Sequence, residues 1–450
     1  MRDCLKVGYA RKDITPTEPV PLSGYGDSYR RISVGVLDQL CATCIAFTDE
    51  NNNTLALCTV DLCYVSDRIW PVVVEQAAAK WGIPKDAIIL AATHTHSGPD
   101  YQQDLCESAV RYREFLIESL VQVIGEAMAD RKAAKMEIAR TNNEGLNFVR
   151  HYLMEDGSYA GDNFGDRKTK KVLHSVTQPD RNIQLIKIIR DSEKDILMVN
   201  WQAHPALAST GTSDYGKEHR FYITSDYVGV TRRVVEERTG MQFAFFQGAS
   251  GNVSSRTYDP KESVTRNHVE YGEQFAEFII KGLNGFVPVS GEGVNARSML
   301  FHGKTDHTED HLLPYAKIVA EEWENTGDYF KCKELGEPYG INTCYHATSI
   351  LRKVTMGEYL DMNLGAGRVG EIGFAFIPYE PFDTNGMYIK ENSPFEMTFI
   401  LGYANGYFNY VPSKLGFEYN CYERNQCKHE PGTGEAVADT ILQTLQELHK

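Results

Sequence analysis

The sequence has no stretch near the roughly 18 uninterrupted apolar residues that a membrane-spanning helix needs. Its first residues, MRDCLKVGYARKDITP, lack an apolar segment followed by a small-residue cleavage site, so they do not resemble a secretory signal. No run is rich in Lys and Arg, and 61 acidic against 46 basic side chains give a net charge of −15, which repels phosphate backbones. We therefore expect a soluble, cytoplasmic protein with no integral membrane segment and no nucleic-acid partner.

Cysteine is too sparse for a secreted disulfide scaffold, since ten are scattered over 450 residues, and we expect reduced thiols. Cys41 and Cys44 form a CxxC motif within the apolar, strand-like run LCATCIAF. In a strand, an offset of three directs the two sulfur atoms to opposite faces. The pattern favours buried structural cysteines over a metal or redox pair.

No internal repeat, low-complexity tract or Pro/Ser-rich linker divides the chain, and 42% hydrophobic residues are enough for it to fold. Short β-rich runs alternate with helical periodicity, which predicts an α/β fold with mixed β-sheets flanked by helices. Strands are predicted at 55–61, 86–93, 195–202 and 241–247, helices at 68–81, 105–129, after Ser225-Asp226 and at 434–449, and a β-rich block at about 350–412. We expect one large catalytic domain over residues 1–450, with 300–345 as an insertion or lid.

Four polar motifs each follow an apolar, strand-like run directly. They are THTHSGP at 93–99, AHP at 203–205, QGASGNVS at 247–254 and PYE at 378–380. In open α/β sheets functional groups gather beyond the strand ends, so we expect these motifs to form one site. His94, His204 and Glu380 supply two imidazoles and a carboxylate, a ligand set that suits catalytic zinc. Taken singly, each imidazole is also typical of a structural histidine, and the carboxylate of a solvated one.

His96 lies two positions from His94, so in extended backbone both imidazoles face the same side. One of them can bind the metal while the other moves protons or bonds the substrate, because imidazole changes charge near neutral pH. The alternative is a pair of polar residues in a turn before Gly98-Pro99. For Asp61, which ends the predicted strand 55–61, the alternatives are a hydrogen bond to a ligand histidine and a turn cap.

Two further motifs resemble known signatures but lack their context. Gly365 to Gly370 matches GxGxxG, yet a strand follows it instead of a helix, so we interpret these glycines as a hairpin turn. Gly248-Ala-Ser250-Gly251 resembles a nucleophile elbow, but position 252 is Asn where that motif needs Gly. A serine hydrolase built on Ser250 stays as an alternative.

Taken together, the motifs resemble the neutral/alkaline, non-lysosomal ceramidase family, and the likeness covers its catalytic domain. The matching pieces run in order from about residue 6 to 448: VGYARKDITP with LSGYG, THTHSGP, AHP, GASGNVS, and IPYEPF followed by ANGYFNYVP. The resemblance implies a zinc-dependent amide hydrolase acting on a small-molecule N-acylated substrate. It implies metal ligands at His94, His204, Glu380 and Tyr410, and catalytic roles for His96, Arg150, Ser254 and Tyr422. The pair Tyr422-Glu423, twelve residues past Tyr410, fits the same register.

The chain departs from the family pattern at three positions near these motifs. Tyr379 stands where the family has Gly, Asn252 where it has Asp, and Ser255 where it has Pro. The departures leave the role of Ser254 open and keep a zinc-binding protein without activity as one alternative. Ester or lactone hydrolysis at the same site is another, because a metal-activated water attacks either carbonyl. For Arg150 the alternatives are substrate orientation with oxyanion stabilisation and a surface ion pair.

The substrate is expected to be small and polar. The chain shows no leader and no basic amphipathic helix of the kind that binds anionic lipid surfaces. The segments expected to line the site, 150–152, 213–222 and 403–410, are polar and aromatic. Such side chains favour a soluble N-acylated amine or amino sugar, or a related lactone, with an acyl group of a few carbons.

Overall fold

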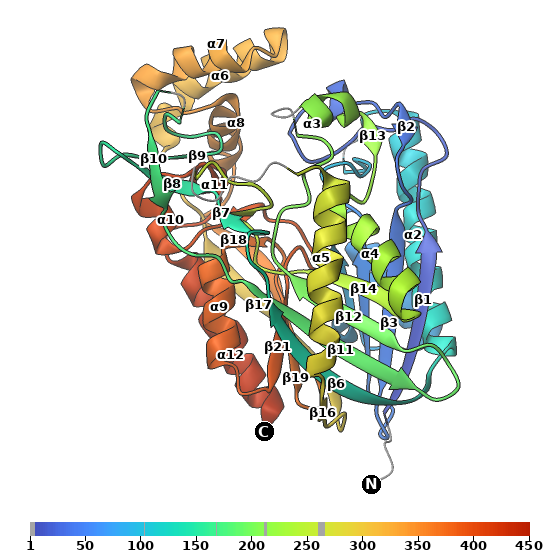
Figure 1. Cartoon of the computed structure of the whole chain (residues 1–450). Helices are drawn as coiled ribbons and strands as arrows, with labels where there is room; N and C mark the ends of the chain where they lie inside the picture. The colour runs from blue at the N-terminus through green and yellow to red at the C-terminus, as the bar shows by residue number, and fades with distance from the viewer. Residues whose placement is uncertain (1–4, 103, 168, 211–213, 260–265) are drawn as a thin grey trace.

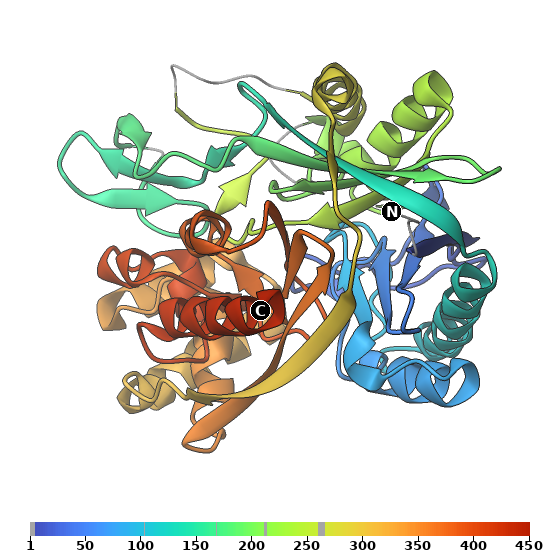
Figure 2. The same cartoon turned by 90° about the horizontal axis from the view of Figure 1, so that it is seen from below.

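The computed structural model describes residues 5–102, 104–167, 169–210, 214–259 and 266–450. Two mixed β-sheets pack face to face and helices cover their outer faces, giving four layers (Figures 1 and 2). The predicted α/β fold with mixed sheets and flanking helices is confirmed.

The larger sheet has nine strands. Its order is β14-β12-β11-β6-β1-β3-β4-β5, and β16 also pairs with β6. The pairs β12/β14 and β4/β5 are parallel and the others are antiparallel. The strands are β1 (Lys6–Asp13), β3 (Cys41–Thr48), β4 (Thr54–Val60), β5 (Ile88–Ala92), β6 (Lys132–Asn142), β11 (Asn182–Arg190), β12 (Ile196–Trp201), β14 (Gln242–Gln247) and β16 (Val287–Val289).

The smaller sheet has the order β17-β18-β19-β21, with β19 and β21 parallel. Its strands are β17 (Val294–Lys304), β18 (Tyr359–Val369), β19 (Ile372–Phe376) and β21 (Met397–Leu401). Short strands form four small sheets around the ends of the two large ones. One has three strands in the order β10 (Val172–Ser175), β8 (His151–Met154) and β9 (Tyr159–Gly161). The other three are pairs: β13 (Tyr222–Ile223) with β2 (Gly35–Val36), β15 (Val253–Ser254) with β7 (Phe148–Val149), and β20 (Glu380–Pro381) with β22 (Tyr410–Val411).

The apolar core lies in three layers between these elements. Alternate residues of both sheets, such as Phe47, Met198 and Phe374, interdigitate between the sheets because successive strand side chains face opposite ways. Helices α1 (Trp70–Trp81) and α2 (Glu107–Ala129) cover one half of the larger sheet. Figure 1 shows α4 (Tyr227–Thr239) and α5 (His268–Gly282) over the other half, and α9 (Asp383–Asn392) and α12 (Thr433–His449) over the smaller sheet.

The helices are α1 (Trp70–Trp81), α2 (Glu107–Ala129), α3 (Asp214–His219), α4 (Tyr227–Thr239), α5 (His268–Gly282), α6 (Leu313–Thr326), α7 (Tyr329–Gly336), α8 (Cys344–Lys353), α9 (Asp383–Asn392), α10 (Lys414–Glu418), α11 (Tyr422–Gln426) and α12 (Thr433–His449). Within the described ranges, none of them has both the length and the apolar character that crossing a bilayer requires. The predicted helices correspond to α1, α2, α4 and α12, and the Asp226 side chain accepts from the first amide of α4 as expected.

One prediction about local structure needs correction, and a second stays untested. Gly365 and Gly367 lie inside β18, and of the three glycines only Gly370, with φ of 56°, is in the hairpin turn. A Cβ at 365 or 367 would meet the Phe376 ring of the neighbouring strand at 2.8 or 3.0 Å, so cross-strand packing explains both glycines. The segment 300–345 begins inside β17, a strand of the smaller sheet, and its helices α6 and α7 pack with α8 in an apolar cluster of their own. Its role as an insertion or lid stays a prediction.

The cysteines follow the expected pattern. None of the nine that the structure describes forms a disulfide. Cys44 is buried in β3 beside Cys58 of β4, and Cys41 is half-buried at the start of β3. Both residues of the CxxC motif therefore belong to the sheet.

Candidate functional site

The four polar motifs meet where parallel strands of the two sheets end. His94 follows β5, His204 follows β12, Ser250 follows β14, and Glu380 opens β20 just after β19. His94 has a positive φ of 71°, and its amide donates to the Leu62 carbonyl at 2.8 Å. A left-handed backbone at a non-glycine residue is unfavourable by itself, so the surrounding contacts hold this turn in place.

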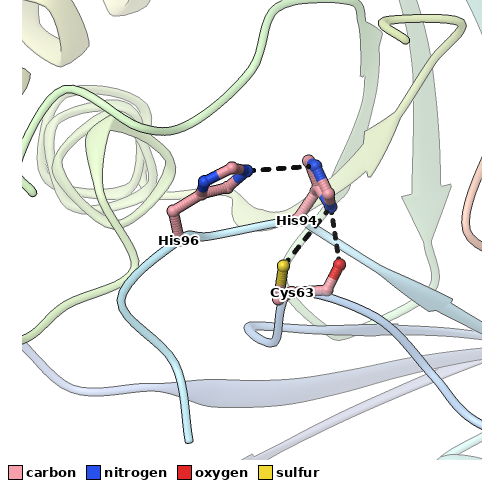
Figure 3. A group of neighbouring side chains, drawn as sticks. All are labelled: Cys63, His94 and His96. Carbon is pink, nitrogen blue, oxygen red and sulfur yellow. Dashed lines mark hydrogen bonds between the residues drawn. The ribbon is translucent and has the colours of Figure 1, made fainter. Parts of the chain in front are cut away.

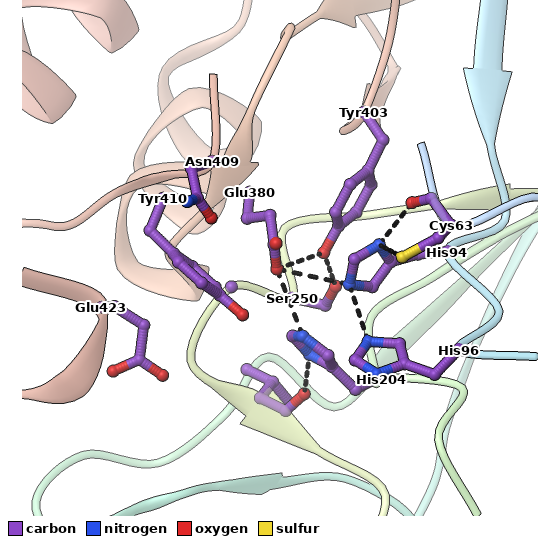
Figure 4. Close-up of polar contacts among 12 residues, drawn as sticks. Cys63, His94, His96, His204, Ser250, Glu380, Tyr403, Asn409, Tyr410 and Glu423 are labelled. Atoms are coloured by element: carbon purple, nitrogen blue, oxygen red, sulfur yellow. Dashed lines mark hydrogen bonds and ion pairs between the residues drawn. The ribbon is translucent and has the colours of Figure 1, made fainter. Parts of the chain in front are cut away.

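His94, His204 and Glu380 converge on one buried point. The Nε2 atoms of His94 and His204 lie 3.3 and 3.2 Å from Glu380 Oε2. The three side chains share a cluster whose ligand atoms lie within 4.8 Å of one another, and each residue is at most 3% exposed (Figure 4).

The backbone fixes the orientation of both imidazoles. His94 Nδ1 lies 2.6 Å from the Cys63 carbonyl oxygen, and His204 Nδ1 lies 3.1 Å from that of Val253 (Figures 3 and 4). Because a carbonyl only accepts, each Nδ1 carries a proton, and each ring turns its Nε2 toward Glu380. His204 Nε2 is buried and has no hydrogen-bond partner among the described residues. This donor set, with its backbone-held tautomers, fits a metal ion.

The charges of the cluster are strongly coupled. Burial alone would raise the pKa of Glu380, but the adjacent His94 and His204 imidazoles hold it well below its usual value. Burial lowers the pKa of His204 to about 4, whereas the Glu380 carboxylate outweighs burial at His94 and raises its pKa to about 10. A buried carboxylate facing two imidazoles is an environment suited to a cation.

Tyr410 is brought beside Glu380 by the short β20/β22 pair, in which the two residues are direct partners. Figure 4 shows its hydroxyl directed into the space that Glu380 and His204 face. Arg150 Nη2 donates to that hydroxyl at 3.3 Å. The predicted fourth ligand is therefore placed with the other three.

His96 lies on the open side of His94. Its Nε2 is 3.2 Å from His94 Nε2 (Figure 3). Tyr25 packs edge-on against its ring with a centroid distance of 5.0 Å. Gly24, at φ of 114°, permits this packing, because a Cβ there would come within 2.7 Å of the His96 side chain. Burial and the neighbouring His94 keep the pKa of His96 well below its usual value, so the ring is a neutral base.

Arg150 is buried and its interactions cross the site. The guanidinium binds Glu423 through Nε at 2.7 Å and the Gly251 carbonyl through Nη2 at 2.8 Å. The second Glu423 oxygen lies 2.8 Å from His151 Nε2. The ion pair of Arg150 is therefore buried and not on the surface, and it lies at the edge of the cluster formed by His94, His204 and Glu380, here called the metal-type cluster. Tyr422 is half-buried, with its ring 5.9 Å from that of Tyr410.

Ser250 and Ser254 differ in their surroundings. Ser250 Oγ accepts from Gln247 Nε2 at 2.7 Å and lies 2.9 Å from the Tyr403 hydroxyl, and no imidazole is among its recorded partners in the described chain. That arrangement gives no base for a serine nucleophile. Ser254 lies in β15 beside His204, and its hydroxyl accepts from the Arg256 amide at 3.3 Å.

The structure explains how the three departures from the family pattern are accommodated. Asn252 Nδ2 donates to Asp383 Oδ1 at 2.6 Å, and Asn252 Oδ1 accepts from the Asp383 amide at 2.9 Å. Ser255 Oγ donates to the His204 carbonyl at 3.0 Å, and Tyr379 is buried in the core under α12. None of these contacts displaces His94, His204 or Glu380, so the departures leave the metal-type cluster intact.

Some residues have partners that the sequence did not indicate. Asp61 neither touches a ligand histidine nor caps a turn: it pairs with Arg232 at 2.7 Å and accepts from the Cys41 amide. The Cys63 carbonyl holds His94 instead. Glu423 orients Arg150 through the bond to its Nε. Both tyrosines of ANGYFNYVP, Tyr407 and Tyr410, lie beside Glu380.

Asp383, the partner of Asn252, is a buried carboxyl whose titration can be tested by the pH dependence of stability. Burial raises the pKa of Asp383 to about 6 from 3.8. A raised carboxyl pKa makes the unfolding free energy fall as pH rises between those values, by up to about 3 kcal/mol. We expect Asp383→Asn to remove this slope and to stabilise the protein at pH 8, as measured by urea unfolding at pH 5 and pH 8. Equal slopes in variant and wild type would contradict a carboxylate whose burial outweighs its hydrogen bonds.

Comparisons with known proteins identify the family and the fold of the chain. The sequence model of a family described as neutral/alkaline non-lysosomal ceramidase, N-terminal, matches residues 5–280, more than half of the chain. The crystal structure of neutral ceramidase from Pseudomonas aeruginosa matches with a TM-score of 0.72 and 16% identity, covering 99% of this chain and 74% of that one. A structure described as ceramidase complexed with C2 matches with a TM-score of 0.71 and 16% identity, covering 99% and 75%. The two structures show a shared fold.

Proposed function

Since this chain belongs to the neutral/alkaline ceramidase family, a family of amide hydrolases, we propose that it hydrolyses an N-acylated substrate with one zinc ion. The convergence of His94 Nε2, His204 Nε2 and Glu380 Oε2 at 3.2 to 3.3 Å is the observation that carries the proposal. Two imidazoles and a carboxylate are a common catalytic zinc set, which leaves room for a further ligand.

The proposed ligands are His94, His204, Glu380 and Tyr410. When bound, zinc polarises an amide carbonyl and makes water nucleophilic near neutral pH. The Cys63 and Val253 carbonyls keep both Nδ1 protons in place, so the two Nε2 lone pairs stay available. Burial excludes bulk water from these atoms and strengthens every charge interaction among them.

The other residues would move protons and bind the reacting oxygen. The His96 ring is neutral and reaches the cluster through Nε2, so it is placed to accept a proton from the attacking water and return it to the leaving amine. Arg150 keeps its charge beside Glu423 and can donate to the negative charge that develops on the carbonyl oxygen. Tyr422 borders the same space through Tyr410, and Ser254 is a neighbouring hydroxyl for substrate binding.

We further propose that the substrate is compact and polar, with a short acyl group. The side chains around the cluster support this: Arg150 and His96 are polar, and Tyr25, Tyr410 and Tyr422 are aromatic with a hydroxyl. Aromatic faces with a few directed donors favour a substrate of limited apolar size.

A substrate panel tests both parts. Purified protein, zinc-loaded or stripped by a chelator, is assayed with a short-chain N-acetyl amine, the corresponding ester, a lactone and a long-chain ceramide in detergent. We expect turnover only with zinc, and faster turnover of the N-acetyl compound than of the ceramide. Full activity after chelation would contradict the metal. A clear preference for the long chain would contradict only the substrate class.

A further inference from the structure

The loop between β21 and β22 is an unusual piece of backbone. Tyr403, Asn405 and Asn409 have positive φ values of 58°, 51° and 68°, and Gly406 has 147°. Left-handed backbone is rare for a bulky aromatic residue such as Tyr403, and it persists only where the surroundings impose it. Contacts with the surrounding chain therefore hold this loop in its conformation.

Backbone hydrogen bonds tie this loop to both metal-site segments. The Glu380 amide donates to the Asn409 carbonyl at 2.8 Å, and the Tyr403 amide donates to the Tyr379 carbonyl at 3.2 Å. The Asn405 amide donates to the Leu90 carbonyl of β5, the strand that leads to His94, at 2.9 Å. The loop is therefore fixed relative to Glu380 and to His94 at once.

Two side chains of the loop hold the Glu380 carboxylate. The Tyr407 hydroxyl donates to Glu380 Oε1 at 3.0 Å, on the oxygen opposite the two imidazoles. The Tyr403 hydroxyl lies 3.4 Å from Oε2, the oxygen that faces them. The two oxygens of Glu380 therefore have different partners: Oε1 accepts from Tyr407, and Oε2 is the oxygen that faces both imidazoles.

The rings of the same tyrosines are themselves packed. Tyr407 stacks on Tyr64 with a centroid distance of 4.6 Å, and Tyr403 stacks on His94 at 4.1 Å. Tyr403 also joins Ser250, whose hydroxyl is 2.9 Å from its own. Each ring has one stacking partner, and this contact restricts the directions in which its hydroxyl can point.

We propose that Tyr407, assisted by Tyr403, is a positioning residue that holds Glu380 as a one-oxygen metal ligand. Neither tyrosine touches substrate in this assignment; both act through Glu380. Hydrogen-bond partners of metal ligands typically change metal affinity by about 10 to 100-fold when they are removed. The inference rests on the proposed metal site.

Zinc affinity tests this role more directly than activity. Apoprotein is titrated with zinc against a chromophoric chelator, and folding is checked by circular dichroism. We expect Tyr407→Phe, which keeps the ring on Tyr64, to raise the zinc dissociation constant about 10 to 100-fold. Tyr403→Phe should raise it by less, because its hydroxyl is farther from the carboxylate.

Tyr64→Phe is the matched control. It removes a buried hydroxyl from the ring stacked on Tyr407, and that hydroxyl donates to Asp100 instead of Glu380. We expect its zinc affinity to match wild type. Wild-type affinity in both Tyr407→Phe and Tyr403→Phe would overturn the inference, and Tyr403→Phe alone decides it if Tyr407→Phe does not fold. A wild type that binds no zinc would instead defeat the proposed function.

Discussion

Replacing His204 with alanine is expected to lower turnover of the best amide substrate by at least about 10³-fold and to abolish tight zinc binding. A metal ion in such a site contributes several kcal/mol to the transition state, and each 1.36 kcal/mol is about tenfold in rate. His204 carries one of the two imidazole nitrogens that face Glu380, at 3.2 Å. In the variant, His94 is the one remaining imidazole of the His94, His204 and Glu380 cluster, so the proposed zinc site loses one of its ligand atoms.

Ser250→Ala is the matched control because Ser250 follows a strand that ends at the same site. Among the described residues its hydroxyl bonds to Gln247 and Tyr403, so we expect a loss of stability of about 1 to 3 kcal/mol with most of the turnover kept. Initial rates and zinc content are measured on folded protein for both variants. An active His204→Ala protein together with an inactive Ser250→Ala protein would reverse the assignment in favour of serine catalysis.

The sequence predicted the large elements because they carry strong periodic signals. The apolar runs at 55–61 and 195–202 correspond to β4 and β12, whose residues are all buried. The short strands β7, β13, β15 and β20 have two residues each, which is too few for an alternating pattern. Their pairing depends on contacts between distant segments, such as Val149 with Val253. Local sequence does not contain that information.

The same division applies to the site. Functional groups after strand ends are a general feature of α/β folds, so a shared site for His94, His204 and Glu380 could be predicted from their motifs. Its assembly from the strand ends of two different sheets could not. The groups that orient these ligands do not follow from the motifs either. The Cys63 carbonyl is backbone, and the position of Tyr407 depends on a left-handed loop held by distant hydrogen bonds. Asp61 is a case in which position after a strand was misleading. It suggested a hydrogen bond to a ligand histidine, but the partner of Asp61 is Arg232.

Arg150→Ala is expected to lower kcat by about 10² to 10³-fold with a smaller change in KM. Loss of one donor to a developing oxyanion costs that much in other hydrolases, and the effect falls on the transition state more than on substrate binding. Arg150 is the guanidinium nearest the Tyr410 hydroxyl in the described contacts, at 3.3 Å. Arg150→Lys should recover only a small part of the rate. An ammonium lacks the planar fork that binds Glu423 and the Gly251 carbonyl together.

Stability must be separated from catalysis in this experiment, because Arg150→Ala leaves the Glu423 carboxylate buried beside His151 alone. Breaking a buried ion pair in this way costs about 3 to 5 kcal/mol. Arg232 of α4 forms a comparably buried ion pair with Asp61, and none of its hydrogen bonds or ion pairs within the described ranges involves His94, His204, Glu380 or Tyr410. Arg232→Ala therefore controls for that loss. We expect both variants to unfold at lower urea concentration and only Arg150→Ala to lose kcat per folded molecule. An equal loss of kcat in Arg232→Ala would show that breaking a buried ion pair is enough to lower the rate. The proposed catalytic role of Arg150 would then be wrong.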